Sequence, residues 1–343
     1  MVTAPGVLAE VVRGDLVESV HRGHLVVLAP DGGTVLEVGD ADAVTWPRSS
    51  LKPLQAVAML RSGLAVDDEG LALACASHSG TDAHLAVVRR VLAGAGLDEG
   101  ALRNTPDLPL DADAAWAWRA AGHAPSSVTQ NCSGKHAAML ATCVAAGWDT
   151  ATYLDPEHPL QRAVRATVGE LTGVPVAHVT VDGCGAPLLS TTVRGLARGL
   201  GRVARAAARP GAAPDDALAR VGRAMAAHPD LVGGPGRDVT AVMRAVPGLV
   251  AKDGAEGVYA AGLPDGSAVA FKVEDGSGRP RPAVLVAALA VALRAAGSPV
   301  PDALAAAGAT PVLGHGRPAG AVRTAFGGGT ASAGSGAPEA VDR

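Results

Sequence analysis

Asn131-Cys132-Ser133-Gly134-Lys135-His136 is the stretch from which the organisation of this chain is most readily worked out. One of two asparagines, one of four cysteines and one of four lysines fall within its first five residues. Cys132 and Lys135 stand three positions apart where a helix over 133–146 is predicted to start, so their side chains share one face. A phosphate loop is excluded, because no glycine lies five positions before Gly134 and neither Ser nor Thr follows Lys135.

The thiol and the amine at this helix start allow two interpretations. A thiolate is stabilised at a helix N-terminus and binds soft metals, so Cys132 and Lys135 could be two ligands of a zinc ion. Asp182-Gly183-Cys184-Gly185 could supply a third ligand, since its glycines let the backbone bend tightly. Such a site would keep an open fourth position, and its lysine would have to be neutral. The alternative is a helix start with buried thiols, and spacing alone leaves both open.

Lysine is scarce in this chain. Of 29 basic residues only four are lysine, namely Lys52, Lys135, Lys252 and Lys272. Where composition favours arginine, a lysine that supplies only surface charge can be replaced, but one that must lose its proton cannot, because guanidinium stays charged. Each lysine is therefore a candidate for chemistry, unless four is simply what the compositional bias leaves.

Arg48-Ser49-Ser50-Leu51-Lys52 precedes a predicted helix over 50–61, with Pro53 confined to its first turn. Ser49 and Lys52 share a face there, and a neutral lysine can activate a serine hydroxyl. The helix N-terminus disfavours the ammonium and favours oxyanions. The spacing also occurs by chance, and the alternative is an N-cap serine followed by a solvated lysine.

A second serine segment, Cys75-Ala76-Ser77-His78-Ser79-Gly80, follows a short apolar helix predicted over 71–76. Small polar residues at such a point are typical of a pocket edge, although a helix end capped by glycine explains them equally well. Lys252 and Lys272 stand at predicted strand edges that can face a cleft. One of them is the natural partner for Ser77.

The composition bounds the function class. With 343 residues, 48% hydrophobic and 18% charged, the chain is globular rather than disordered. A net charge of −4 gives no basic surface for nucleic acid or an anionic membrane. The longest apolar run, 282–293, is shorter than the roughly 20 residues that span a bilayer. The N-terminus lacks a secretory pattern and the cysteines suggest no disulfide framework, so a soluble cytoplasmic protein is expected.

Strand patterns at both ends enclose a helical middle. Strands are predicted over 7–12, 23–29, 34–38, 248–252, 257–263 and 268–274. Helices are predicted over 83–93, 156–171, 188–199, 215–227 and 281–296, besides those above. We expect an α/β fold whose sheet is built from both termini beside a central helical lobe, forming one catalytic domain over 1–326. Residues 327–343 are rich in Gly, Ala and Ser and are expected to be a disordered tail.

Taken together and in order, several segments resemble the asparaginase II family, the zinc-binding, serine-type (rhizobial-type) L-asparaginases, over about residues 7–296. They are Val17–Arg22, Arg48–Pro53, Cys75–Ser79, Asn131–His136, Asp182–Cys184, Met225–Pro229 and Lys252–Gly254. The resemblance implies a fold similar to serine β-lactamases and glutaminases. It also implies hydrolysis of L-asparagine to L-aspartate and ammonia by a homodimer.

The resemblance implies roles residue by residue. Ser49 matches the nucleophile and Lys52 its base, while Ser77 and Lys252 match a second Ser–Lys pair. Cys132, Lys135 and Cys184 match the ligands of Zn²⁺, whose role is either catalytic or structural. The expected substrate-binding residues are Arg48, Asn131, His136 and Asp182.

Three rival functions remain. Glutamine or another small amide is the nearest, since one methylene in a pocket changes discrimination by only about 1–3 kcal/mol. A penicillin-interacting enzyme shares the Ser-x-x-Lys spacing but would normally be exported. A non-enzymatic zinc-binding or thiol protein accounts for the cysteines but leaves both serine–lysine pairs unexplained.

Overall fold

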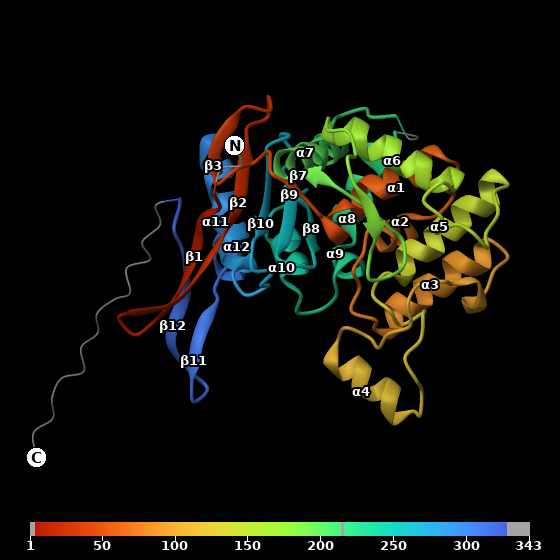
Figure 1. Cartoon of the computed structure of the whole chain (residues 1–343), viewed down its shortest axis with the longest axis horizontal. Coiled ribbons are helices and arrows are strands. Elements are labelled where there is room, and N and C mark those ends of the chain that lie inside the picture. Colours follow the sequence, from red (N-terminus) through yellow and green to blue (C-terminus); the bar gives the residue numbers. More distant parts are fainter. Residues whose placement is uncertain (1–3, 214–215, 328–343) are drawn as a thin grey trace, which may run out of the picture.

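The computed structural model describes residues 4–213 and 216–327. An antiparallel sheet occupies one half of the molecule and a group of helices the other, with the two halves in contact (Figure 1). The mixed α/β class expected from the sequence is confirmed. The finer likeness to serine β-lactamases and the single domain over 1–326 stay predictions. The expected tail lies outside the described residues, apart from Gly327.

The main sheet takes its strands from both ends of the chain. Its order is β11-β12-β1-β2-β10-β9-β8, with β3 also paired to β2, and all of these pairs are antiparallel. These strands are β1 (Gly6–Arg13), β2 (Leu16–Leu28), β3 (Thr34–Val38), β8 (Val250–Gly254), β9 (Val258–Gly262), β10 (Ala268–Val273), β11 (Pro311–Gly314) and β12 (Arg317–Thr324). Two short pairs lie apart from the sheet: β4 (Val44–Thr45) with β7 (Thr191–Thr192), and β5 (Val179–Val181) with β6 (Pro187–Leu189).

The sheet is larger than the sequence patterns predicted. β2 begins at Leu16 rather than near residue 23, because its first residues pair with β1 while their side chains stay exposed and carry no burial pattern. β11 and β12 fall in the segment past residue 300, for which no element was predicted. Both are largely exposed, and β12 belongs to the sheet through its pairing with β1, for example Val11 with Val322.

Between the strand groups the chain is mainly helical. Its helices are the 3₁₀ turns η1 (Arg48–Leu51) and η2 (Glu99–Ala101) and the helices α1 (Lys52–Arg61), α2 (Asp68–Ala74), α3 (Asp82–Gly94), α4 (Ala112–Ala120), α5 (Ser133–Ala146), α6 (Pro159–Thr172), α7 (Val193–Ala208), α8 (Ala217–Ala227), α9 (Pro229–Val232), α10 (Asp238–Ala245), α11 (Arg281–Ala295) and α12 (Asp302–Ala307). In the described part of the chain no helix is both long and apolar enough to cross a bilayer.

One predicted helix is displaced along the sequence. The helix expected over 188–199 is α7, which begins at Val193 and continues to Ala208. The residues before it form β6 and β7 instead, and the Thr192 hydroxyl accepts a hydrogen bond from the Gly195 N–H as an N-cap. An apolar run with alanine spacing does not distinguish a short buried strand from a helix start, and the cap decided this boundary.

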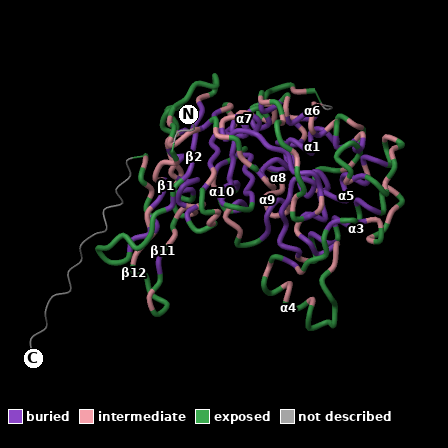
Figure 2. Tube along the Cα trace, viewed as in Figure 1, coloured by how far each residue is buried: buried purple, intermediate pink, exposed green. Residues whose placement is uncertain are grey.

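Helix α7 joins the two halves of the molecule. It packs against β9, β10 and β2 of the sheet and against α6 and α8 of the helical half, and buried residues continue through this region (Figure 2). The backbones of β9 and α7 lie very close together. A Cβ added at Gly262 of β9 would lie only 2.3 Å from the Leu200 carbonyl oxygen of α7. Glycine is therefore required where strand and helix backbones meet.

This contact yields a stability prediction. Gly262→Ala should lower the free energy of unfolding by about 1–3 kcal/mol, because the added methyl group overpacks the α7 interface. The control is Gly94→Ala at the end of α3, where an added Cβ would meet no atom of the described part of the chain within 4 Å. That change should be neutral or slightly stabilising. Urea unfolding measures both, and equal effects at the two sites would contradict the packing described.

Candidate active site

The amine of Lys52 connects the three sequence segments singled out above. Its side chain is 1% exposed. Nζ donates to the Ala76 carbonyl, lies 3.2 Å from the Ser77 hydroxyl oxygen and lies 3.1 Å from the Cys132 sulfur. One buried amine at the start of α1 therefore contacts both the second serine segment and the thiol at the start of α5.

Ser77 is held in an extended segment that leaves α2 and runs beside the turn between α9 and α10. The Ser77 N–H donates to the Val232 carbonyl at 3.2 Å, and the Ser79 N–H donates to the Gly233 carbonyl at 2.9 Å. Gly234 has φ +133°, and a Cβ there would lie 2.2 Å from the Ser79 hydroxyl. The backbone around Ser77 is thus fixed on one side by main-chain hydrogen bonds.

Ser49 lies in the 3₁₀ turn η1 and is half-buried. The preceding residue, Arg48, has φ +51°, a left-handed conformation that non-glycine residues rarely adopt. Arg48 Nε donates to Asp182 Oδ1 at 2.8 Å, which ties the turn to the loop that carries Cys184. Strained backbone conformations are common at functional sites. Here the strained residue precedes the candidate nucleophile, and its own side chain forms an ion pair with Asp182.

Lys252 is completely buried on β8. Its amine donates to the side chain and the carbonyl of Asp253, so its hydrogen-bonding partner is this carboxylate and not Ser77. Burial lowers the pKa of Lys252 to about 8, against the opposing effect of Asp253. Burial alone would raise the pKa of Asp253, but Lys252, Arg237 and Arg281 hold it well below its usual range.

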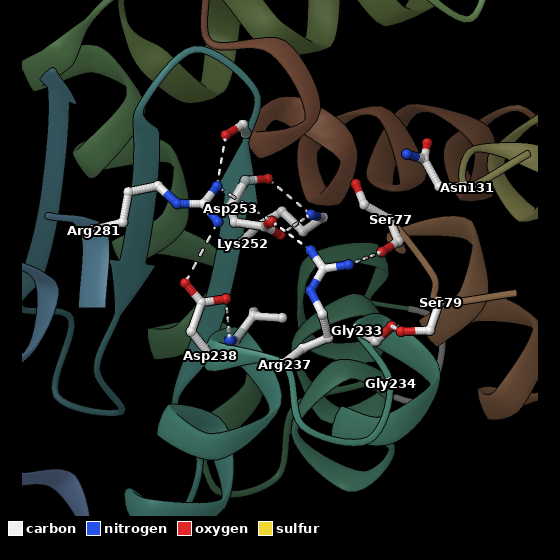
Figure 3. Close-up of polar contacts among 12 residues, drawn as sticks. Ser77, Ser79, Asn131, Gly233, Gly234, Arg237, Asp238, Lys252, Asp253 and Arg281 are labelled. Atoms are coloured by element: carbon white, nitrogen blue, oxygen red, sulfur yellow. Dashed lines mark hydrogen bonds and ion pairs between the residues drawn. The ribbon is translucent and has the colours of Figure 1, made fainter. Parts of the chain in front are cut away.

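Two arginines complete this polar group (Figure 3). Arg237 precedes α10, and its Nη2 donates to Asp253 Oδ2 at 2.9 Å while its Nη1 reaches the Ser77 carbonyl at 3.5 Å. Arg281 at the start of α11 donates to the Gly254 carbonyl at 3.0 Å. It also lies 3.6 Å from carboxylate oxygens of both Asp253 and Asp238.

Cys132, Cys184 and Lys135 converge in a buried cluster. The Lys135 amine lies 3.3 Å from the Cys184 sulfur. A hydrogen bond between the two sulfurs raises the pKa of Cys132 and lowers that of Cys184 to about 4. Burial would lower the pKa of Lys135, but the two neighbouring sulfurs raise it. In the absence of a metal, these shifts favour a thiolate at Cys184 beside a charged Lys135.

Amides and a histidine surround this cluster. Cys132 Sγ lies 3.0 Å from Asn131 Oδ1, and the Cys132 N–H donates to Gln130 Oε1 at 2.9 Å. His136 Nδ1 lies 2.8 Å from the Tyr153 hydroxyl, whereas its buried Nε2 has no hydrogen-bond partner among the described residues. These contacts fix the orientation of the thiol and leave one imidazole nitrogen available.

Zinc in proteins needs at least three donor side chains. Within residues 4–213 and 216–327, no three His, Cys, Asp or Glu side chains gather in a way that holds a metal ion. A zinc site here therefore depends on the Lys135 amine besides the two sulfurs. Two thiolates and one amine make an N/S donor set of the kind that zinc takes, so the residues present fit the ion once Lys135 has lost its proton.

The structure brings most of the predicted residues into linked contacts. Lys52, Ser77 and Cys132 form one set, Arg48 and Asp182 a second, and Lys135 and Cys184 a third. Two surface hollows, of about 320 and 530 Å³, are lined by other residues. The sequence interpretation missed Arg237 and Arg281. Arginine is abundant in this chain, and only the neighbouring Lys252-Asp253-Gly254 motif hinted at a charged group here.

Comparison with known proteins gives one strong match. The model of the family described as L-asparaginase II matches residues 9–324, which extends past the range of about 7–296 expected from the sequence. A search of the curated proteins finds no match.

Among solved structures, Mglu in its tris and glutamate form is similar with a TM-score of 0.41 and 16% identity, covering 78% of this chain and 58% of that one. This chain thus spans less than two thirds of the length of Mglu. A β-lactamase from Mycobacterium bovis has a TM-score of 0.41 and 16% identity, covering 83% of this chain and 93% of that one.

The strained turn yields a second stability prediction. Arg48→Gly and Arg48→Ala both lose the ion pair with Asp182, but only alanine keeps the penalty of a left-handed backbone at φ +51°. The glycine variant should be more stable than the alanine variant by about 1–2 kcal/mol. Chemical denaturation of the pair provides the measurement. A more stable alanine variant would contradict the strained conformation.

Proposed function

Since this chain belongs to the L-asparaginase II family and is therefore an amidohydrolase, we propose that it hydrolyses the side-chain amide of L-asparagine to L-aspartate and ammonia. The observation that carries the proposal is the buried Lys52 amine, which stands three positions after Ser49 in the sequence and lies 3.2 Å from the Ser77 hydroxyl oxygen. An amine in such a position can move protons between hydroxyls and a substrate.

In the proposed reaction Ser49 attacks the amide carbon of asparagine and Lys52, in its uncharged form, accepts the hydroxyl proton. Collapse of the tetrahedral intermediate breaks the C–N bond, and Ser77 passes the proton from Lys52 to the leaving nitrogen, which departs as ammonia. Water then attacks the acyl-enzyme, releases aspartate and returns a proton to Ser49. Backbone N–H groups of the η1 and α1 start are the candidates for stabilising the oxyanion.

Binding of a free amino acid requires a cation for its carboxylate and an anion for its ammonium. The Arg48–Asp182 pair supplies both charges, and its side chains are 24% and 11% exposed. Guanidinium groups bind carboxylates in a bidentate manner, which fixes orientation. We therefore propose that this pair, with Asn131 and His136 nearby, positions the substrate against Ser49.

Cys132, Lys135 and Cys184 would hold zinc in this proposal. When bound, the ion would act as a Lewis acid or as a template that orients the substrate. The contribution of the chain itself is to hold Cys132 between the Lys52 amine and the Asn131 amide, so that the donor atoms are in place. The homodimer and the cytoplasmic location expected from the sequence stay predictions.

Serine substitutions test the reaction. Ser49→Ala and Ser77→Ala should each reduce kcat/KM for ammonia release from L-asparagine, Ser49→Ala by at least about 10³-fold because it removes the nucleophile. The control is Ser19→Ala on an exposed part of β2, which should keep wild-type rates. Near-normal turnover in Ser49→Ala would contradict the assignment. Faster release from glutamine than from asparagine in the wild type would overturn the substrate.

Metal analysis tests the zinc site separately from activity. Purified wild-type protein and Cys143→Ser, a control at a buried cysteine elsewhere in α5, should bind about one zinc per chain. Cys184→Ser and Lys135→Met should lose most of it, because three ligands hold the ion. Elemental analysis after dialysis gives the ratio. Equal zinc content in Cys184→Ser and wild type would show that the metal is bound elsewhere.

A further inference from the structure

The Asp253 carboxylate lies among three basic side chains that come from three separate parts of the chain. Lys252 on β8 contacts its Oδ1, while Arg237 contacts Oδ2 at 2.9 Å and Arg281 lies 3.6 Å from the same oxygen. The Asp253 side chain is 7% exposed, so water screens these charges little. The carboxylate is therefore shared and does not belong to Lys252 alone.

The formal charges of this group balance in one protonation state. Arg237 and Arg281 are always charged, and Asp253 and Asp238 neutralise them. A charged Lys252 would leave one buried positive charge in excess, which is costly. An uncharged Lys252 leaves the group neutral. The arrangement of the two arginines thus favours the amine that can act as a base.

Arg237 also connects this group with the catalytic serine segment. One of its terminal nitrogens reaches the Ser77 carbonyl and the other the Asp253 carboxylate (Figure 3). Its own backbone N–H donates to the Gly234 carbonyl at 3.3 Å, in the turn whose residues Val232 and Gly233 accept from Ser77 and Ser79. Arg237 is therefore attached to the backbone on which Ser77 depends.

We propose that Arg237 is a positioning residue: by binding the Asp253 carboxylate it weakens the pairing of that carboxylate with Lys252, so that Lys252 is an uncharged amine in the group that Arg237 links to the Ser77 carbonyl. This rests on the proposed amidohydrolase reaction, in which the Ser77 hydroxyl relays protons. Arg237 acts through Asp253 and through the Ser77 carbonyl and needs no contact with the substrate.

The charged groups around Lys252 support this direction. Asp253 on its own strand favours the ammonium, whereas Lys52 of α1 and Arg237 disfavour it, and burial disfavours it most. Arg281 of α11 faces the same carboxylate. The thiol of Cys75, which follows α2, is close enough to Lys252 for an electrostatic interaction between them. Burial raises the pKa of that thiol to about 12, so it stays neutral and adds no charge.

The scarcity of lysine makes a direct test feasible. Protein grown with ¹³Cε-labelled lysine gives four side-chain signals, and the signal lost in Lys252→Arg identifies Lys252. Its chemical shift is followed between about pH 6 and pH 11 without substrate or added metal. The wild-type midpoint should lie near 8.

Substitutions then change the charge balance in both directions. Arg237→Met should raise the Lys252 midpoint by about one pH unit, since a nearby cation is lost and Asp253 is freed for the amine. Arg237→Lys keeps the charge and should stay close to wild type. Asp238→Asn should lower the midpoint, because the released Arg281 binds Asp253 more strongly. The matched control is Arg244→Met in α10, which removes a surface ion pair with Asp230 of α9. It should leave the Lys252 midpoint unchanged.

Specific outcomes overturn the proposal. It fails if Arg237→Met and Arg244→Met give the same midpoint. It also fails if Asp238→Asn raises the midpoint, because a raised midpoint in both variants means that water has entered a loosened core. If Arg237→Met does not fold, the sign of the Asp238→Asn shift decides alone.

Activity separates this proposal from the proposed function. The proposal requires an uncharged Lys252 in addition to the Lys52 base, so in Arg237→Met the rise of kcat/KM with pH should move to higher pH together with the Lys252 signal. If wild-type protein released no ammonia from any amide, the reaction would be wrong while the titration result stood. If activity were normal and the Lys252 midpoint insensitive to Arg237, only the positioning role would be wrong.

Discussion

The burial of lysine amines is the constraint on which the rest of this structure depends. Lys52, Lys135 and Lys252 are 1%, 2% and 0% exposed, and an uncompensated buried ammonium costs several kcal/mol. Each amine therefore needs a partner or must lose its proton. The partners of Lys52 and Lys135 come from distant segments of the chain, whereas Lys252 is paired with the adjacent Asp253.

The three amines are compensated in three different ways. Lys135 is paired with the Cys184 thiolate and remains charged. Lys52 is surrounded by neutral acceptors, a carbonyl, a hydroxyl and a thiol. Lys252 shares its carboxylate with two arginines and has a lowered pKa. The same side chain thus serves as a charge partner at one place and as a candidate base at another, because its neighbours differ.

The sequence predicted those parts of the fold that local chemistry decides. Helix α5 begins at Ser133 and ends at Ala146 as expected, because its alanine content and the glycine after it act locally. The pairing of β12 with β1 could not be predicted, since exposed strands far apart in sequence carry no apolar pattern. For the site, scarcity identified the lysines, but their partners depended on tertiary contacts. Lys52, rather than Lys252, is hydrogen-bonded to Ser77. Nothing in the sequence distinguishes Arg237, which contacts the Ser77 carbonyl, from the many other arginines of the chain.

The central claim is that the buried Lys52 amine takes part in catalysis by losing and regaining a proton. The most direct measurement is the steady-state rate of ammonia release from L-asparagine by Lys52→Arg, compared with Lys272→Arg on the half-buried lysine of β10. Arginine keeps a positive charge and hydrogen-bond donors but cannot be deprotonated. The account predicts a loss of at least about 10²-fold in kcat for Lys52→Arg, with the fold retained, and a nearly unchanged rate for Lys272→Arg. A folded Lys52→Arg variant with wild-type turnover would contradict it.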